Sequence, residues 1–199
     1  MYKRQTLTFV DEKGNYGALG HGISDVDTGE LLEIQNGALY QAQILGIQKG
    51  AKGSPGELSG LIRYEPGKII GSIETNSKNG IYGHFTGDRK SPISLKKMPV
   101  GYKQEVTEGK ASILCCVEDE VKEYQAEITK IDMNHSDTNK SFVIRVADPK
   151  LLSVTGGIVQ GMSGSPVLQN GKIIGAVTHV FVQDSTSGYG IFIENMMEH

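Results

Sequence analysis

Ser163 lies between glycines in the stretch Gly161-Met162-Ser163-Gly164-Ser165-Pro166. Glycines on both sides let the backbone turn tightly, which exposes the serine hydroxyl and lets neighbouring backbone N–H groups converge on one point. Such N–H groups stabilise the oxyanion that forms when a serine attacks a carbonyl carbon. An apolar strand, the turn Asn170-Gly171 and a second apolar strand follow. The pattern predicts Ser163 as a nucleophile, with the N–H groups of Gly161 and Ser163 as its oxyanion hole.

The same stretch resembles the nucleophile loop of chymotrypsin-like serine peptidases, whose pattern is Gly-x-Ser-Gly-Gly-Pro. Ser165 replaces the second glycine. Met162 stands where digestive members carry an acidic residue that pairs with a new N-terminus, so we expect no activation through that ion pair. In the resembling fold the strand after the serine borders the substrate. The resemblance therefore implies that Thr178, His179 and Val180 contact the bound peptide.

A serine nucleophile needs a base, and the chain has five histidines, His21, His84, His135, His179 and His199. His135 lies in a polar turn, and His199 is the last residue. His21 lies in Gly17-Ala18-Leu19-Gly20-His21-Gly22-Ile23, where small residues allow close packing around the ring. His84 ends an apolar run, where a structural role is expected. On spacing alone, His21 only modestly outranks His84 as the base.

The acid that would orient the base has two interpretations. Asp148 ends an apolar strand 15 residues before the serine (163 − 148), and a carboxylate there could fix the imidazole tautomer. Pro149 follows it, so Asp148 could equally be the N-cap of a short helix with proline at its first position. Asp25 and Asp27 follow His21 too closely to brace the same ring.

Composition excludes several classes of protein. The 199 residues carry 20 Lys and Arg against 23 Asp and Glu, a net charge of −3 without a basic stripe, so binding to nucleic acid through phosphate neutralisation is not expected. No apolar run approaches the length that spans a bilayer, and the N-terminus lacks the apolar core of a signal peptide. We expect a soluble domain without membrane contact of its own.

The spacing of turns predicts an all-β fold. Twenty-six glycines punctuate short apolar runs, with strands recurring every 8–12 residues, which is typical of a sandwich or barrel. Only residues 148–152 and 194–197 are expected to be helical. The segment 91–103 is the expected crossing between two halves of one domain, approximately residues 1–95 and 96–199.

The two cysteines, Cys115 and Cys116, are neighbours. Adjacent strand residues point to opposite faces, so a mutual disulfide would be strained, and the pair has no zinc-site spacing. We expect ordinary strand residues. A cysteine-based enzyme is disfavoured, because no glycine-rich turn surrounds them.

Longer stretches resemble one family, the stage IV sporulation protein B serine peptidases of spore-forming bacteria. The resemblance rests on residues 153–160, the loop around Ser163, residues 176–181 and 188–194, and the histidine motif at 17–23. It implies a chymotrypsin-like double β-barrel with the active site between the two barrels. It also implies a triad of His21, Asp148 and Ser163 that needs no metal and no cofactor.

The resemblance further implies a membrane-tethered regulatory protein as substrate, cleaved between forespore and mother cell to activate a late sporulation sigma factor, and cleavage of the enzyme by itself. Full-length members carry an N-terminal membrane segment and a PDZ domain, so the chain is expected to be an excised peptidase domain. A catalytically silent binding domain on the same barrel remains the alternative.

Overall fold

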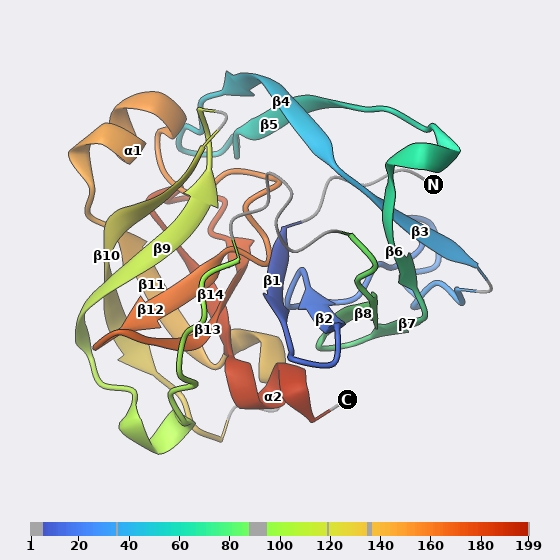
Figure 1. The fold of residues 1–199 in the computed structure, drawn as a ribbon. Coiled ribbons are helices and arrows are strands. Elements are labelled where there is room, and N and C mark those ends of the chain that lie inside the picture. The colour runs from blue at the N-terminus through green and yellow to red at the C-terminus, as the bar shows by residue number, and fades with distance from the viewer. Residues whose placement is uncertain (1–5, 35, 88–94, 119, 135–136, 199) are drawn as a thin grey trace.

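The computed structural model describes residues 6–34, 36–87, 95–118, 120–134 and 137–198 (Figure 1). His135 and His199 lie outside these ranges, as does part of the expected crossing at 91–103. The prediction of one domain with its halves meeting near residue 95 stays a prediction. In the described part of the chain, no helix is long and apolar enough to cross a membrane.

The N-terminal half is built from short antiparallel strands. One sheet has the order β1-β2-β8-β7. Two separate two-stranded sheets, β3 with β6 and β4 with β5, make up the rest of this half. An isolated bridge between Gly71 and Phe85 connects β6 to the end of β8. The strands are β1 Leu7–Val10, β2 Asn15–Ala18, β3 Gly37–Tyr40, β4 Ala42–Gln48, β5 Glu57–Ile62, β6 Ile69–Ile73, β7 Thr75–Ser77 and β8 Gly80–His84.

The C-terminal half is a closed barrel with the strand order β10-β11-β14-β13-β12-β9. Its strands are β9 Gly109–Cys116, β10 Val121–Ile131, β11 Phe142–Val146, β12 Pro166–Gln169, β13 Lys172–Val180 and β14 Ser187–Phe192. The helices are α1 Pro149–Thr155 and α2 Ile193–Met197, with 3₁₀ turns at Pro66–Lys68, Lys103–Glu105 and Thr138–Lys140. The all-β prediction is confirmed, and α1 and α2 lie where helices were expected.

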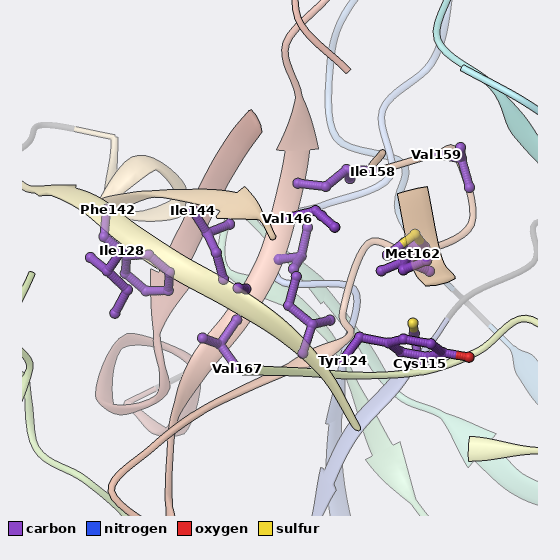
Figure 2. Packing of buried hydrophobic residues seen from close by; sticks show 14 of the residues in the cluster. Cys115, Tyr124, Ile128, Phe142, Ile144, Val146, Ile158, Val159, Met162 and Val167 are labelled. Carbon is purple, nitrogen blue, oxygen red and sulfur yellow. The ribbon is translucent and has the colours of Figure 1, made fainter. Parts of the chain in front are cut away.

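The barrel closes around one apolar core because its strands alternate between inward and outward side chains. On β10, Tyr124, Ala126 and Ile128 are buried while their neighbours are exposed or half-buried. Figure 2 shows Tyr124 and Ile128 among residues of β11, and Met162, which precedes Ser163, belongs to the same cluster. The nucleophile loop is thus anchored in the barrel core through the side chain next to the serine.

The cysteines behave as strand residues, as predicted. Neither forms a disulfide, and they end β9, with Cys115 buried and Cys116 half-buried. Burial raises the pKa of the Cys115 thiol to about 12, with smaller contributions from Cys116 and Asp148. A thiol with so high a pKa carries almost no thiolate at neutral pH, so Cys115 is unsuited to nucleophilic chemistry.

Candidate active site

The loop that carries Ser163 needs glycine at two positions. Gly161 has φ +101° and Gly164 has φ +89°, both in the left-handed region that other residues avoid. A Cβ on Gly164 would lie 2.3 Å from the carbonyl oxygen of Thr6 and 2.5 Å from the backbone nitrogen of Leu19. The nucleophile loop therefore packs directly against the backbone of the N-terminal half.

The hydrogen bonds of the loop leave two N–H groups available. The N–H groups of Met162, Gly164 and Ser165 donate to the carbonyls of Val159, Val177 and Met162, at 3.1, 2.7 and 2.9 Å. Among the hydrogen bonds of the described residues, none uses the N–H of Gly161 or Ser163. These are the two donors predicted to form the oxyanion hole.

Two threonines from the start of the chain fix the loop from the other side. Thr6 Oγ1 donates to the carbonyl of Gly161 at 3.0 Å, and Thr8 Oγ1 donates to that of Gly164 at 2.8 Å. Thr8 is buried, on β1. The sequence gives no sign of either contact, because nothing near a threonine at the start of the chain signals a partner 155 or 156 positions away.

His21 follows β2 and sits at the junction of the two halves. Leu19 and Gly20 before it have φ +74° and +71°, so the chain reverses sharply there. A Cβ on Gly20 would meet the side chains of Thr178 and Ile191, which explains the glycine. The small residues around His21 thus permit the close packing against β13 and β14 that the sequence suggested.

One hydrogen bond sets the tautomer of His21. Its Nδ1 lies 2.9 Å from the carbonyl oxygen of Gly22. A carbonyl oxygen can only accept, so Nδ1 carries the proton of the neutral ring and Nε2 keeps its lone pair. A general base acting on a serine hydroxyl needs this tautomer.

Consecutive residues of β13 contact Ser163 and His21. The Ser163 hydroxyl donates to the carbonyl of Thr178 at 2.7 Å, and so is not hydrogen-bonded to His21 here. The His179 ring stacks on that of His21, with centroids 4.7 Å apart and planes tilted by 32°. The structure therefore brings Ser163 and His21 to one short segment of β13, which includes the residues predicted to contact substrate.

The alternative base, His84, lies elsewhere. In the pairing of β2 with β8, Asn15 faces His84 and Ala18 faces Ile81. His21 continues from the Ala18 end, so His84 stands at the opposite end of the sheet. Asp25 accepts hydrogen bonds from the N–H groups of Asp27 and Thr28, which makes it part of a local turn.

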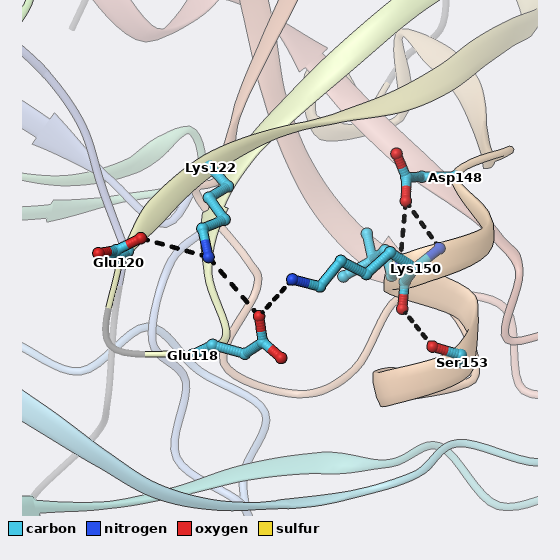
Figure 3. Close-up of polar contacts among 7 residues, drawn as sticks. Glu118, Glu120, Lys122, Asp148, Lys150 and Ser153 are labelled. Atoms are coloured by element: carbon cyan, nitrogen blue, oxygen red, sulfur yellow. Dashed lines mark hydrogen bonds and ion pairs between the residues drawn. The ribbon is translucent and has the colours of Figure 1, made fainter.

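Asp148 caps α1, as its second interpretation predicted. One carboxylate oxygen accepts from the N–H groups of Lys150 and Leu151, at 2.9 and 3.1 Å, and the other from the N–H of Gln125 at 3.2 Å. Figure 3 shows the carboxylate at the start of α1 and the Lys150 side chain bonded to Glu118. Among the described residues, the carboxylate's hydrogen bonds are these three, so the structure shows no direct bond to His21.

A large cavity lies behind the nucleophile loop. It has a volume of about 1490 Å³ and is lined by residues of both halves, among them Leu39, Leu58, Leu114 and Met162. Gly161 and Met162 of the nucleophile loop line it, whereas Ser163 and His21 do not. In the described ranges, no three histidine, cysteine or acidic side chains gather as metal ligands.

Two solved structures are similar to this chain, the inactive and active forms of the Rv3671c protease, the latter from M. tuberculosis. Each is 13% identical with a TM-score of 0.46. The inactive form matches over 82% of this chain and 84% of its own, and the active form over 79% and 70%. No curated protein matches the chain significantly.

The family described as SpoIVB peptidase S55 matches residues 5–197, nearly the whole chain. The match includes both halves of the fold and the loop, histidine and strand described above. The chain is a serine peptidase, and it belongs to the SpoIVB peptidase S55 family.

Proposed function

We propose that the chain cleaves peptide bonds with Ser163 as nucleophile and His21 as general base. The observation that carries this proposal is that neighbouring residues of β13 contact both groups: Ser163 Oγ donates to the Thr178 carbonyl, and the His179 ring lies 4.7 Å from that of His21. The contact of His21 Nδ1 with the Gly22 carbonyl supports a neutral ring whose Nε2 can accept the serine proton. The glycine turn and the two available N–H groups support it.

The reaction follows from these groups. Ser163 Oγ attacks the peptide carbonyl carbon while its proton passes to His21 Nε2. The resulting oxyanion accepts hydrogen bonds from the N–H groups of Gly161 and Ser163, and one such donor contributes about 10²–10³-fold in rate. The His21 proton then passes to the leaving amine. Water, deprotonated by His21, hydrolyses the acyl-enzyme and restores both residues.

Substrate has to reorient the nucleophile. In the free protein the hydroxyl donates to the Thr178 carbonyl, whereas attack requires it to donate to His21. Catalytic hydrogen bonds commonly form only in the enzyme–substrate complex. A peptide lying along Thr178, His179 and Val180 would meet this carbonyl, so we assign these residues to substrate binding.

The role of Asp148 is less direct than those of Ser163 and His21. The family resemblance implies that it orients His21, and the structure supports its role as a helix cap. Orientation of His21 by Asp148 stays a prediction, which its amide variant tests below.

The family name points to spore formation. We accordingly propose a membrane-anchored sporulation regulator as substrate, in the space between forespore and mother cell, and cleavage of the enzyme by itself as a second reaction. Incubating purified protein with the extracytoplasmic part of such a regulator and mapping new termini tests the substrate assignment.

A fluorophosphonate probe tests the catalytic proposal against the silent-domain alternative. Labelling should map to Ser163 and disappear in Ser163→Ala. Ser165→Ala is a matched control, because this neighbouring hydroxyl is fully buried and should not react. Labelling that persists in Ser163→Ala, or fails in a folded wild type, would reject the nucleophile assignment.

A further inference from the structure

The N–H of Gly161, one of the two proposed oxyanion donors, belongs to a peptide unit whose other end is bonded to β5. The carbonyl of Gln160 and the N–H of Gly161 share one peptide bond, and the N–H of Leu58 donates to that carbonyl at 2.9 Å. No peptide bond in the described part of the chain is cis, so the N–H of Gly161 points opposite to the carbonyl. The bond from Leu58 therefore sets the direction of this N–H.

Glycine at position 161 does not hold this orientation by itself. Rotating the Gln160–Gly161 peptide by half a turn would change the φ of Gly161 from +101° to about −79° (101 − 180). Glycine adopts that conformation as readily as the observed one. The rotated peptide would present a carbonyl oxygen where the mechanism needs a donor, and this oxygen would repel the developing oxyanion. A contact from outside the peptide unit must therefore favour the observed orientation.

The next peptide unit of the loop is fixed separately. Between Gly161 and Met162, the carbonyl accepts from Thr6 Oγ1 at 3.0 Å, and the N–H donates to the carbonyl of Val159 at 3.1 Å. That unit is bonded at both ends. In the preceding unit the N–H of Gly161 has to stay available for substrate, so its orientation depends on the bond that its carbonyl accepts from Leu58.

Leu58 contacts the loop with its side chain as well as its backbone. The side chain is buried in the same core cluster as Met162, and a Cβ on Gly161 would lie 3.2 Å from the Leu58 Cβ. A second backbone bond runs beside the first, from the N–H of Gln160 to the carbonyl of Gly56 at 2.8 Å. The two bonds form a parallel bridge between residue 160 and the start of β5. The contact is thus a short piece of sheet between the two halves.

The hairpin of β4 and β5 is itself anchored on the C-terminal half. The strand pair extends toward α1 (Figure 1). At its turn, the N–H of Gly50 donates to the carbonyl of Thr155 and the N–H of Gly53 to that of Val182, both at 2.8 Å. One of these partners precedes the nucleophile loop in the sequence and the other follows β13. The anchored turn therefore holds the start of β5 against the loop.

We propose that Leu58 is a positioning residue for the oxyanion hole: its backbone N–H holds the Gln160–Gly161 peptide so that the Gly161 N–H faces the oxyanion of the substrate. This inference rests on the proposed function and adds to it a strand of the N-terminal half that positions an oxyanion donor of the C-terminal barrel.

An α-hydroxy acid in place of Leu58 tests the proposal, because the resulting ester removes the N–H and keeps the side chain. We expect kcat per fluorophosphonate-labelled Ser163 to fall by about 10–10³-fold with KM nearly unchanged, the upper value being the full contribution of one oxyanion donor. The acid limb of the pH–rate profile should not move, because His21 is untouched. The same ester at Leu61, which pairs with Gln43 of β4, is the matched control and should keep kcat within about twofold.

A peptide aldehyde provides an independent measurement. Its adduct with Ser163 places an oxygen in the oxyanion hole, so its affinity should weaken by the same factor as kcat falls. A loss of packing alone would lower the melting temperature and the labelled fraction without changing kcat per labelled site.

Two glycines of the hairpin give a second arm with ordinary substitutions. A Cβ on Gly56 would lie 2.2 Å from the carbonyl oxygen of Gln48, whereas one on Gly46 meets nothing within 4 Å, and neither glycine has a positive φ. Gly56→Ala should displace the bridge to Gln160 and lower kcat by up to about 10²-fold at unchanged KM. Gly46→Ala should match wild type.

Equal kcat per labelled site for the esters at Leu58 and Leu61 would overturn the proposal. A raised KM with unchanged kcat would also overturn it and make β5 a substrate contact. If the Leu58 ester does not fold, equal kcat in Gly56→Ala and Gly46→Ala overturns it. A wild type that neither hydrolyses peptide nor labels at Ser163 would instead reject the proposed function, so the two fail separately.

Discussion

At the scale of single residues, Asp148 separates two roles that one carboxylate could have. Asparagine keeps a side-chain oxygen for the N–H groups of Lys150 and Leu151, and caps helices as well as aspartate does. Asp148→Asn should therefore cost less stability than Asp148→Ala, which should lose about 1 kcal/mol as a missing cap. Chemical denaturation of both variants measures this difference.

The rate of Asp148→Asn decides the second role. The cap role alone would leave kcat within about tenfold of wild type, since none of the carboxylate's hydrogen bonds among the described residues reaches His21. A loss of about 10⁴-fold, the effect of the corresponding change in a Ser-His-Asp triad, would show that the carboxylate acts on His21 in the working enzyme. Steady-state peptide hydrolysis below the melting transition distinguishes the outcomes.

His179 gives a prediction about pH. Its pKa is lowered from 6.5 to about 4 by loss of hydration and by its neighbours. The unfolded chain therefore binds more protons at this site between these two pH values, so His179 contributes a loss of stability as pH falls from about 6.5 toward 4. NMR titration should find its midpoint near pH 4. His179→Phe should show a shallower fall of Tm over the same interval, and an ordinary midpoint near 6.5 would contradict the prediction.

The sequence was most informative where chemistry is local. Ser163 lies in a glycine turn that can be recognised from six consecutive residues, and the small residues around His21 indicated close packing. The bond from His21 to Gly22, the stacking of His179 and the cap role of Asp148 depend on backbone direction. For Asp148, local sequence left two interpretations equally open, because a helix cap and a triad acid share the same side chain.

At the scale of elements, β1 supports the nucleophile loop. Thr8→Val keeps the side-chain shape and removes the donor to the Gly164 carbonyl, leaving a buried acceptor without its partner. We expect a stability loss of about 1–3 kcal/mol and slower labelling of Ser163. Denaturation curves and labelling rates measure both. Unchanged stability with unchanged labelling would show that the loop does not depend on β1.

Two glycines with similar φ provide a matched test of the loop. Gly164 and Gly171 have φ +89° and +76°, but a Cβ on Gly164 would clash with Thr6 and Leu19, whereas one on Gly171 meets nothing within 4 Å. Gly171→Ala should cost about 1–2 kcal/mol for the left-handed conformation alone. Gly164→Ala should cost more and abolish labelling. Equal melting temperatures for the two variants would contradict the close approach.

The elements themselves were partly predictable. Alternating apolar residues and turn signals predicted the all-β class, and Asp148 followed by Pro149 predicted the start of α1. Closure of the barrel through β9 and β12, and the pairing of β3 with β6, join strands far apart in the sequence. These pairings depend on side-chain packing across an entire half of the molecule, which a local sequence pattern cannot predict.

At the scale of the whole molecule, the site exists only where the two halves meet. His21 comes from the N-terminal half and Ser163 from the C-terminal barrel, while Thr6 and Thr8 cross between them. In a urea titration, labelling of Ser163 should therefore be lost with the first structural transition, whichever half unfolds. Circular dichroism followed in parallel checks this, and labelling that survives unfolding of one half would contradict it.

The contact of Gly164 with the backbone of Thr6 and Leu19 has a consequence for biosynthesis. A ribosome makes the N-terminal half first, and His21 is added 142 residues before Ser163 (163 − 21). Strands β13 and β14, which complete the barrel, are made later still. A nascent chain therefore has no assembled site until β13 and β14 have been made.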